Sequence, residues 1–181
     1  MFSIEKATGK QCYMLSAKEL SIAWGSSPLY WSWRPALDSR FAEVAELRTI
    51  WWLEIIGRIN NGMLSPATTY GAYLIVQIAD RAYGLDYLAS EVSVSVGNFK
   101  SERNVYIRPH DSKRKGKAPV SGPVLWERED GWTEIELGSF YNEGGNNEEV
   151  TVCLKEVKGV HLKGGLIVQG IEIRPKQIFK G

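Results

Sequence analysis

The sequence has little of what metal sites and disulfide frameworks need. Its 181 residues include only two cysteines and two histidines. Cys12 and Cys153 lie far apart and lack the spacing of zinc ligands, so we expect reduced, structural thiols. His110 and His161 lie in polar or glycine-rich segments and are expected at the surface. No segment has the pattern of a calcium-binding loop, so we expect no metal and no cofactor.

Long apolar runs and an excess of one charge are also missing. No segment approaches the roughly 20 apolar residues that span a bilayer, and the first residues lack the basic-then-apolar pattern of a secretory signal. Lys and Arg total 22 against 21 Asp and Glu, which argues against membrane binding and specific nucleic-acid binding and favours a neutral partner. The length suits one domain. We therefore expect a cytoplasmic single-domain protein.

Common catalytic motifs are absent as well. The sequence has no phosphate-binding G-x-x-x-x-G-K-[ST] loop, no G-x-S-x-G nucleophile elbow and no H-E-x-x-H zinc motif. Glu134 and Glu136 lie on one face of an expected strand, roughly 7 Å apart, between the separations typical of retaining and inverting glycosidases. Such a pair usually belongs to a solvated strand face. We therefore predict that the protein is not an enzyme.

Tryptophan is the residue type that stands out. Seven are present, and Trp24, Trp31 and Trp33 fall within ten positions around a Gly-Ser-Ser-Pro loop. A sugar ring has an apolar C–H face that stacks on an indole, while its hydroxyl groups need directional hydrogen bonds. Three indoles beside a turn cannot all point inward, so this segment predicts a sugar-stacking platform. The other tryptophans are expected to fill the core: Trp51, Trp52, Trp126 and Trp132.

Alternating apolar and polar residues predict strands along most of the chain. At least seven such segments indicate an all-β domain: 51–59, 69–79, 92–96, 105–108, 132–137, 150–155 and 166–173. Ser16 and Glu19 form a capping-box pattern that predicts one short helical turn. Residues 80–90 are less regular and leave room for a second helical turn. The segment 43–47 has helical propensity but is short for a helix among so many strands.

The segment 108–122 is basic and rich in proline and glycine. The cations of Lys113–Lys117 are close enough to act together, which is compatible with a nuclear-import signal or a contact with an anion. A solvated surface loop explains the same composition. Gly116 interrupts the basic run and weakens the nuclear-import interpretation.

Several blocks resemble the plant phloem-lectin, or Nictaba-like, family. The similarity runs in order from Cys12 to Pro175, nearly the whole chain. The blocks are 20–24, 28–33, 43–48, 52–55, 130–132, 134–138, 140–142 and 170–175.

The resemblance implies a jelly-roll-like β-sandwich with short helical turns that binds N-acetylglucosamine oligomers and the core or high-mannose parts of N-glycans. The family's sugar-binding residues match Trp24, Trp31, Asn142 and Glu149 in this sequence. The resemblance also implies a cytoplasmic, nuclear or phloem-sap location, and it allows a homodimer.

The resemblance suggests a division of the chain into three parts. Residues 1–15 are similar to the leader that joins an F-box to the lectin domain, residues 16–176 form the lectin domain, and residues 177–181 form a tail. One alternative stays open. The domain can instead serve as the substrate-recognition or protein-interaction module of an F-box-type ubiquitin ligase with little glycan binding.

Overall fold

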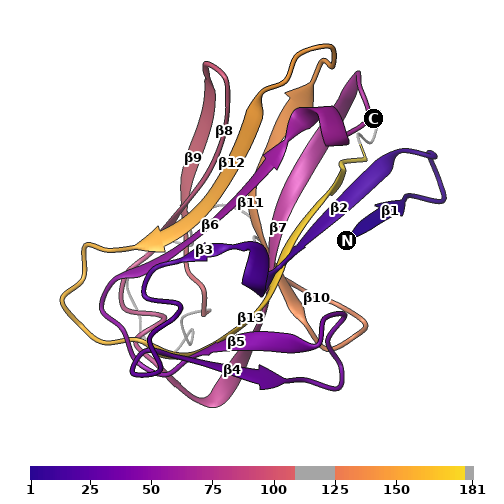
Figure 1. Ribbon diagram of the computed structural model, residues 1–181. Coiled ribbons are helices and arrows are strands. Elements are labelled where there is room, and N and C mark those ends of the chain that lie inside the picture. Colours follow the sequence, from indigo (N-terminus) through magenta and orange to yellow (C-terminus); the bar gives the residue numbers. More distant parts are fainter. Residues whose placement is uncertain (109–124, 178–181) are drawn as a thin grey trace.

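The computed structural model describes residues 1–108 and 125–177, which fold into a jelly-roll-like sandwich of two antiparallel sheets (Figure 1). The first sheet contains β1 (Phe2–Ile4), β2 (Gln11–Ser16), β4 (Trp31–Pro35), β5 (Glu43–Leu47), β7 (Thr68–Tyr83), β10 (Leu125–Glu127), β11 (Thr133–Asn142) and β13 (Gly164–Pro175). The second contains β3 (Ser21–Ile22), β6 (Leu53–Asn60), β8 (Ser90–Val96), β9 (Phe99–Val105) and β12 (Glu149–Glu156). The predicted all-β fold class is confirmed.

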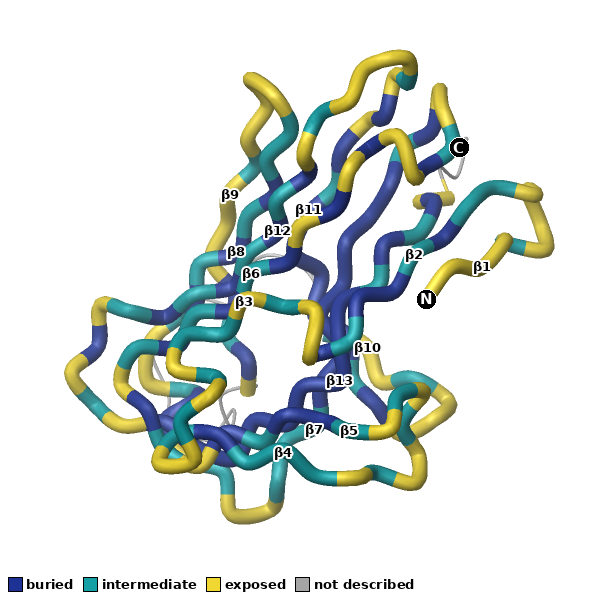
Figure 2. The backbone as a smooth tube through the Cα atoms, viewed as in Figure 1, coloured by how far each residue is buried: buried dark blue, intermediate teal, exposed yellow. Residues whose placement is uncertain are grey.

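Strand order places long strands in the centre of each sheet. The first sheet runs β1-β2-β13-β7-β11-β10, with the β4–β5 hairpin joined to β13, and the second runs β3-β6-β12-β8-β9. Figure 2 shows that β13 is buried along most of its length and β7 mainly in its first half, up to Val76. No helix in the described part of the chain has the length and apolar character needed to cross a membrane.

The core lies between the sheets and follows from residue alternation. On β12, Val150, Val152 and Leu154 are buried, whereas the residues between them are partly exposed. Because successive side chains of a strand point to opposite faces, this pattern directs one face of β12 into the core. A smaller apolar cluster covers the outer side of the first sheet: Met14, Val44, Tyr73, Ile75, Trp132 and Ile167.

The two carboxylates considered as a catalytic pair take part in ion pairs. The guanidinium of Arg174 donates to both oxygens of Glu134 at 2.9 and 2.6 Å. Lys176 Nζ lies 2.8 Å from Oε1 of Glu136. Both side chains are buried, at 8% exposure each, so the pair does not lie on the solvated strand face that the sequence indicates.

The short helical turn predicted from the capping-box pattern is confirmed. The capping box at Ser16 precedes a 3₁₀ turn, η1 (Ala17–Glu19), and the Ser16 N–H donates to the Glu19 carboxylate at 2.7 Å. A second 3₁₀ turn, η2 (Asn61–Met63), follows β6.

Three details differ from the expectations. The segment Glu43–Leu47 is a strand because it pairs with β4 and β13, and this tertiary pairing overrides its helical propensity. Residues 80–90 contain no helical turn, because β7 continues to Tyr83. The strand expected at 105–108 ends at Val105, the last residue of β9.

Two further expectations concern the cysteines and the basic run. Cys12 and Cys153 are free thiols on different sheets, and burial raises the pKa of Cys153 to about 11. Both therefore stay protonated at neutral pH. His110 and Lys113–Lys117 lie outside the described residues.

Candidate functional site: an aromatic cluster at one end of the sandwich

Four aromatic residues gather where two loops meet at one end of the sandwich. The Trp24 ring centroid lies 6.1 Å from that of Tyr30 and 6.4 Å from that of Trp51. Trp51 and Trp52 make an edge-to-face contact at 5.6 Å. Trp24 is 49% exposed and Trp51 is 46% exposed, although both are large apolar residues. We call these four residues the aromatic cluster.

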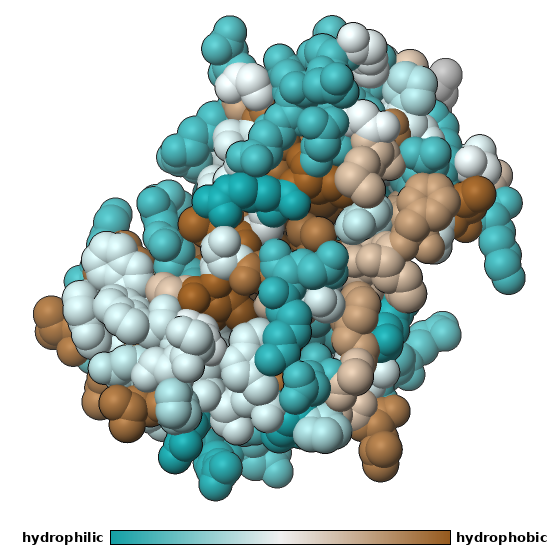
Figure 3. Space-filling model, in the orientation of Figure 1, coloured by the Kyte–Doolittle hydropathy of each residue, from teal (hydrophilic) through white to brown (hydrophobic). Residues whose placement is uncertain are grey.

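The cluster comes from the loop 23–30, between β3 and β4, and the loop 48–52, between β5 and β6. Both loops lie at the lower left of Figure 1. In Figure 3 this end of the molecule has a broad area of near-neutral hydropathy with a few strongly hydrophobic side chains around it.

An unusual turn presents the Trp24 ring to solvent. The Gly25 N–H donates to the Ile22 carbonyl at 2.9 Å, and Trp24 occupies the third position of this turn with φ +54°. That position in a type II turn normally holds glycine, because a positive φ is unfavourable for a bulky side chain. Strained backbone of this kind is concentrated at functional sites.

Two further tryptophans, Trp31 and Trp33, hold the turn in place through hydrogen bonds to its backbone. The indole N–H of Trp31 donates to the Ala23 carbonyl at 3.1 Å, and that of Trp33 donates to the Gly25 carbonyl at 2.8 Å. The two carbonyl groups flank Trp24 in the sequence. The indole hydrogen bonds therefore fix the backbone on both sides of the exposed ring.

Trp31 does not have the exposed position that its predicted role requires. Its side chain is 2% exposed and belongs to the main core. A buried ring has no free face on which a sugar can stack, so the predicted stacking role of Trp31 does not fit this structure. Its place in the structure is to support the backbone of Trp24.

The exposed rings also carry unused hydrogen-bond donors. Within residues 1–108 and 125–177, the indole N–H groups of Trp24 and Trp51 donate to no other group. Arg48 lies beside them, and its guanidinium donates to the Pro28 carbonyl at 3.0 Å while its side chain stays exposed. The cluster thus combines apolar ring faces with polar donors. In the same part of the chain, no group of acidic, His or Cys residues is arranged to hold a metal ion.

Asn142 and Glu149 lie at the opposite end of the sandwich. Asn142 is 2% exposed, and its Nδ2 donates to the carbonyl groups of Asn61, Leu64 and Ser65 at 3.3, 3.4 and 2.9 Å. Glu149 is exposed and pairs in register with Asn60, the last residue of β6.

The length of β6 separates these two residues from the aromatic cluster. Trp51 and Trp52 precede Leu53, the first residue of β6, whereas Glu149 pairs with its last residue. An eight-residue strand at 3.3 Å per residue places its ends about 20 Å apart. The four residues predicted to bind sugar therefore do not form one site.

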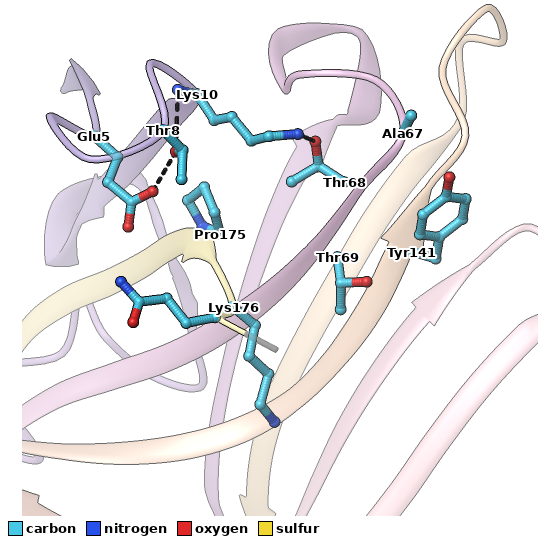
Figure 4. A pocket seen from close by; sticks show the side chains of 10 residues that line it. Glu5, Thr8, Lys10, Ala67, Thr68, Thr69, Tyr141, Pro175 and Lys176 are labelled. Atoms are coloured by element: carbon cyan, nitrogen blue, oxygen red, sulfur yellow. Dashed lines mark hydrogen bonds between the residues drawn. The ribbon is translucent and has the colours of Figure 1, made fainter. Parts of the chain in front are cut away.

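A pocket of about 500 Å³ opens at the Asn142 end, beside the β1–β2 hairpin (Figure 4). Tyr141 is the aromatic residue of its lining. Its two lysines already have partners, since Lys10 donates to the Thr68 hydroxyl and Lys176 pairs with Glu136. With one aromatic ring and no unpartnered cation, this pocket is a weaker candidate than the aromatic cluster.

Comparison with known proteins identifies the family. The model of the phloem protein 2 family matches residues 10–175, which is most of the chain. This chain belongs to the phloem protein 2 family.

Several relatives of this phloem protein 2 chain come from Arabidopsis thaliana. The F-box protein PP2-B10 is 47% identical over 97% of this chain and 64% of the relative. The F-box protein PP2-B15 is 44% identical over 98% of this chain and 69% of the relative. A third F-box protein is 46% identical over 96% of this chain and 54% of its own length. The chain therefore spans only about half to two thirds of the length of these relatives.

In this phloem protein 2 domain, sequence reasoning missed Trp51, which was expected in the core. Alternation gives no signal for its exposure, because it places Trp51 on the same face as Leu53 and Ile55, which are buried. Trp51 is exposed because it lies in the loop before β6 and not in the strand itself. Trp126 was also expected in the core and is exposed on β10, away from the cluster in sequence and sheet position.

Proposed function

We propose that this phloem protein 2 domain is a lectin that binds N-acetylglucosamine oligomers and the core or high-mannose parts of N-glycans at the aromatic cluster. The observation that carries the proposal is the pair of exposed indoles, Trp24 and Trp51, whose ring centroids lie 6.4 Å apart. Binding needs no metal, no cofactor and no catalytic step.

The arrangement suits an amphipathic ligand. Each exposed ring can stack on the C–H face of one sugar, and the free indole N–H groups and Arg48 can donate to hydroxyl or acetamido oxygens. A single sugar gains one stacking contact, and its affinity should be about millimolar after the cost of association. Longer oligomers gain a second contact without repeating most of that cost.

Calorimetric titration tests the proposal. Affinity should rise from N-acetylglucosamine to its dimer and trimer, and the trimer should bind more than about tenfold tighter than cellotriose, which lacks acetamido groups. The same titration in EDTA should give the same affinity. Equal affinity for the two trimers, or no gain with chain length, would contradict the proposed site.

A second candidate function is protein recognition with little glycan binding. Aliphatic side chains that cannot hydrogen-bond to sugar hydroxyls are exposed near the cluster: Leu29, Val160 and Leu162. Several relatives are F-box proteins. In this second candidate function, the domain serves as the substrate-recognition module of a ubiquitin ligase. Capture of a glycoprotein that persists after its N-glycans are removed enzymatically would favour protein recognition, and capture that is lost would favour the lectin.

We also propose that the protein acts in the cytoplasm and nucleus and that it forms a homodimer. The location is the one that the resemblance to the phloem-lectin family implies. A fluorescent fusion found in the secretory pathway would contradict the location. A molar mass equal to that of one chain, measured by light scattering, would contradict the homodimer.

A further inference from the structure

A buried ion pair lies directly beneath the aromatic cluster. Lys163, just before β13, places Nζ 2.5 Å from Oε2 of Glu156, the last residue of β12. The side chains are 1% and 4% exposed. Burying two charges carries a desolvation cost that their attraction often fails to offset. A pair of this kind therefore contributes more to holding one specific arrangement than to stability alone.

The arrangement that it holds includes the backbone of Trp51. Lys163 Nζ also donates to the carbonyl of Trp51 and, at 3.4 Å, to that of His161. The ammonium group therefore makes an ion pair with Glu156 and donates hydrogen bonds to two backbone carbonyls, those of Trp51 and His161. A neutral side chain of similar length cannot supply the positive charge that faces Glu156.

Backbone hydrogen bonds tie the same segments together. Ile50 and Lys163 exchange N–H···O bonds of 3.0 and 2.8 Å. The other oxygen of Glu156 accepts the Gly159 N–H at 3.1 Å. The ion pair thus joins three segments: the end of β12, the loop 157–163 and the loop that carries Trp51.

We propose that Lys163, paired with Glu156, is a positioning residue for the Trp51 half of the glycan site, an inference that rests on the proposed function. The Trp51 ring is nearly half exposed, so packing alone does not fix it, and its direction depends on its backbone. Lys163 anchors that backbone. A ring held in its binding position loses less conformational entropy when a ligand arrives.

The two halves of the cluster are built alike. Trp24 is held by the indole N–H groups of buried Trp31 and half-buried Trp33, which donate to the carbonyls next to it. Trp51 is held by a buried donor, the ammonium of Lys163, that binds its own carbonyl. In both cases a buried polar group orients an exposed ring through the main chain.

The test uses the double variant Lys163→Met/Glu156→Gln. Replacing Lys163 alone would leave Glu156 as a buried, unpaired charge, whereas the double variant removes both charges and keeps side chains of similar length. If it fails to fold, Lys163→Gln/Glu156→Gln serves the same comparison. A matched control is Lys155→Met/Glu91→Gln, which removes an ion pair of 3.4 Å on the outer face of the second sheet.

The first measurement needs no ligand. In ¹H–¹⁵N NMR spectra, the indole resonance of Trp51 should shift and broaden in the Lys163 variant. The indole resonance of fully buried Trp132 should not change. The control variant should leave both signals in place. An unchanged Trp51 resonance in the folded Lys163 variant would overturn the inference.

The second measurement is a double-mutant cycle with Trp51→Ala, read as affinity for the N-acetylglucosamine trimer. Because coupled residues are not additive, the Lys163 variant should lose about fivefold in affinity when Trp51 is present and less than about twofold when it is absent. Equal losses in both backgrounds would overturn the inference. A parent protein that does not bind the trimer would overturn the proposed function instead, and the Trp51 resonance would then decide the positioning role by itself.

Discussion

The two ends of the sandwich use similar polar donors in opposite ways. At the aromatic end, Trp24 and Trp51 are exposed, and their indole N–H groups donate to no group within the described residues. At the other end, Asn142 is buried and its amide donates to three backbone carbonyls. Asn61 beside it binds Asn146 and the Glu148 N–H.

The difference is in the donors: the indole N–H groups are open to solvent, whereas the Asn142 amide N–H groups are engaged by backbone carbonyls and only its buried side-chain oxygen lacks a partner. A donor engaged by the protein's own carbonyls has nothing left for a ligand, and removing it leaves unpaired groups behind. A donor on an exposed ring can be exchanged between water and a ligand at little cost. This comparison supports the proposal that the aromatic end binds a ligand and that the asparagine end contributes to stability.

Replacing Trp31 with Ala should give the largest effect, and the effect should be on folding. The ring is buried in the main core, so its loss should lower the free energy of unfolding by about 3–5 kcal/mol. Urea denaturation measures this change. Unchanged stability in the Trp31→Ala variant would contradict the core position of this ring.

Replacing Trp24 or Trp51 with Ala should act on binding instead. Each ring is about half exposed, so we expect a loss of about 1–3 kcal/mol in binding free energy for the N-acetylglucosamine trimer and little change in unfolding. Calorimetry measures the affinity. Trp126→Ala is a matched control, because it removes an exposed indole on β10 and should leave affinity unchanged. Similar losses for all three variants would contradict the assignment.

Replacing Asn142 with Ala should lower the free energy of unfolding by about 2 kcal/mol, because three buried carbonyls lose a donor. Sugar affinity should stay the same in the folded variant. Urea denaturation and calorimetry on the same sample separate the two effects. Weaker sugar binding without a loss of stability would move the site to this end.

Replacing Glu149 with Gln should give the smallest effect. Its ion pair with Arg58 spans 3.8 Å and both side chains are exposed, so stability should change by less than about 0.5 kcal/mol. Binding should also be unchanged, since Glu149 lies at the far end of β6. A clear drop in trimer affinity would mean that a ligand reaches this end.

The fold was largely predictable because strands are encoded locally. The alternation of Val150, Val152 and Leu154 with polar residues predicts β12 and its buried face. The segment 43–47 was harder, because its strand conformation depends on pairing with β13, more than 100 positions away. Non-local pairing leaves no mark in local propensity.

The site was predictable only in part. Loop context and family resemblance found Trp24, but they could not separate it from Trp31, because the turn at φ +54° decides which ring points outward. Asn142 and Glu149 were assigned to the same site by resemblance alone. Their position at the opposite end follows from strand register, which the sequence does not display.

Chemical-shift mapping with the N-acetylglucosamine trimer tests the central claim most directly, because it reports both ends of the molecule in one experiment. We predict that the largest shifts fall on the indole N–H groups of Trp24 and Trp51 and on Arg48, while the side-chain amide of Asn142 stays in place. Shifts centred on Asn142, or no shifts at saturating trimer, would contradict a glycan site at the aromatic end.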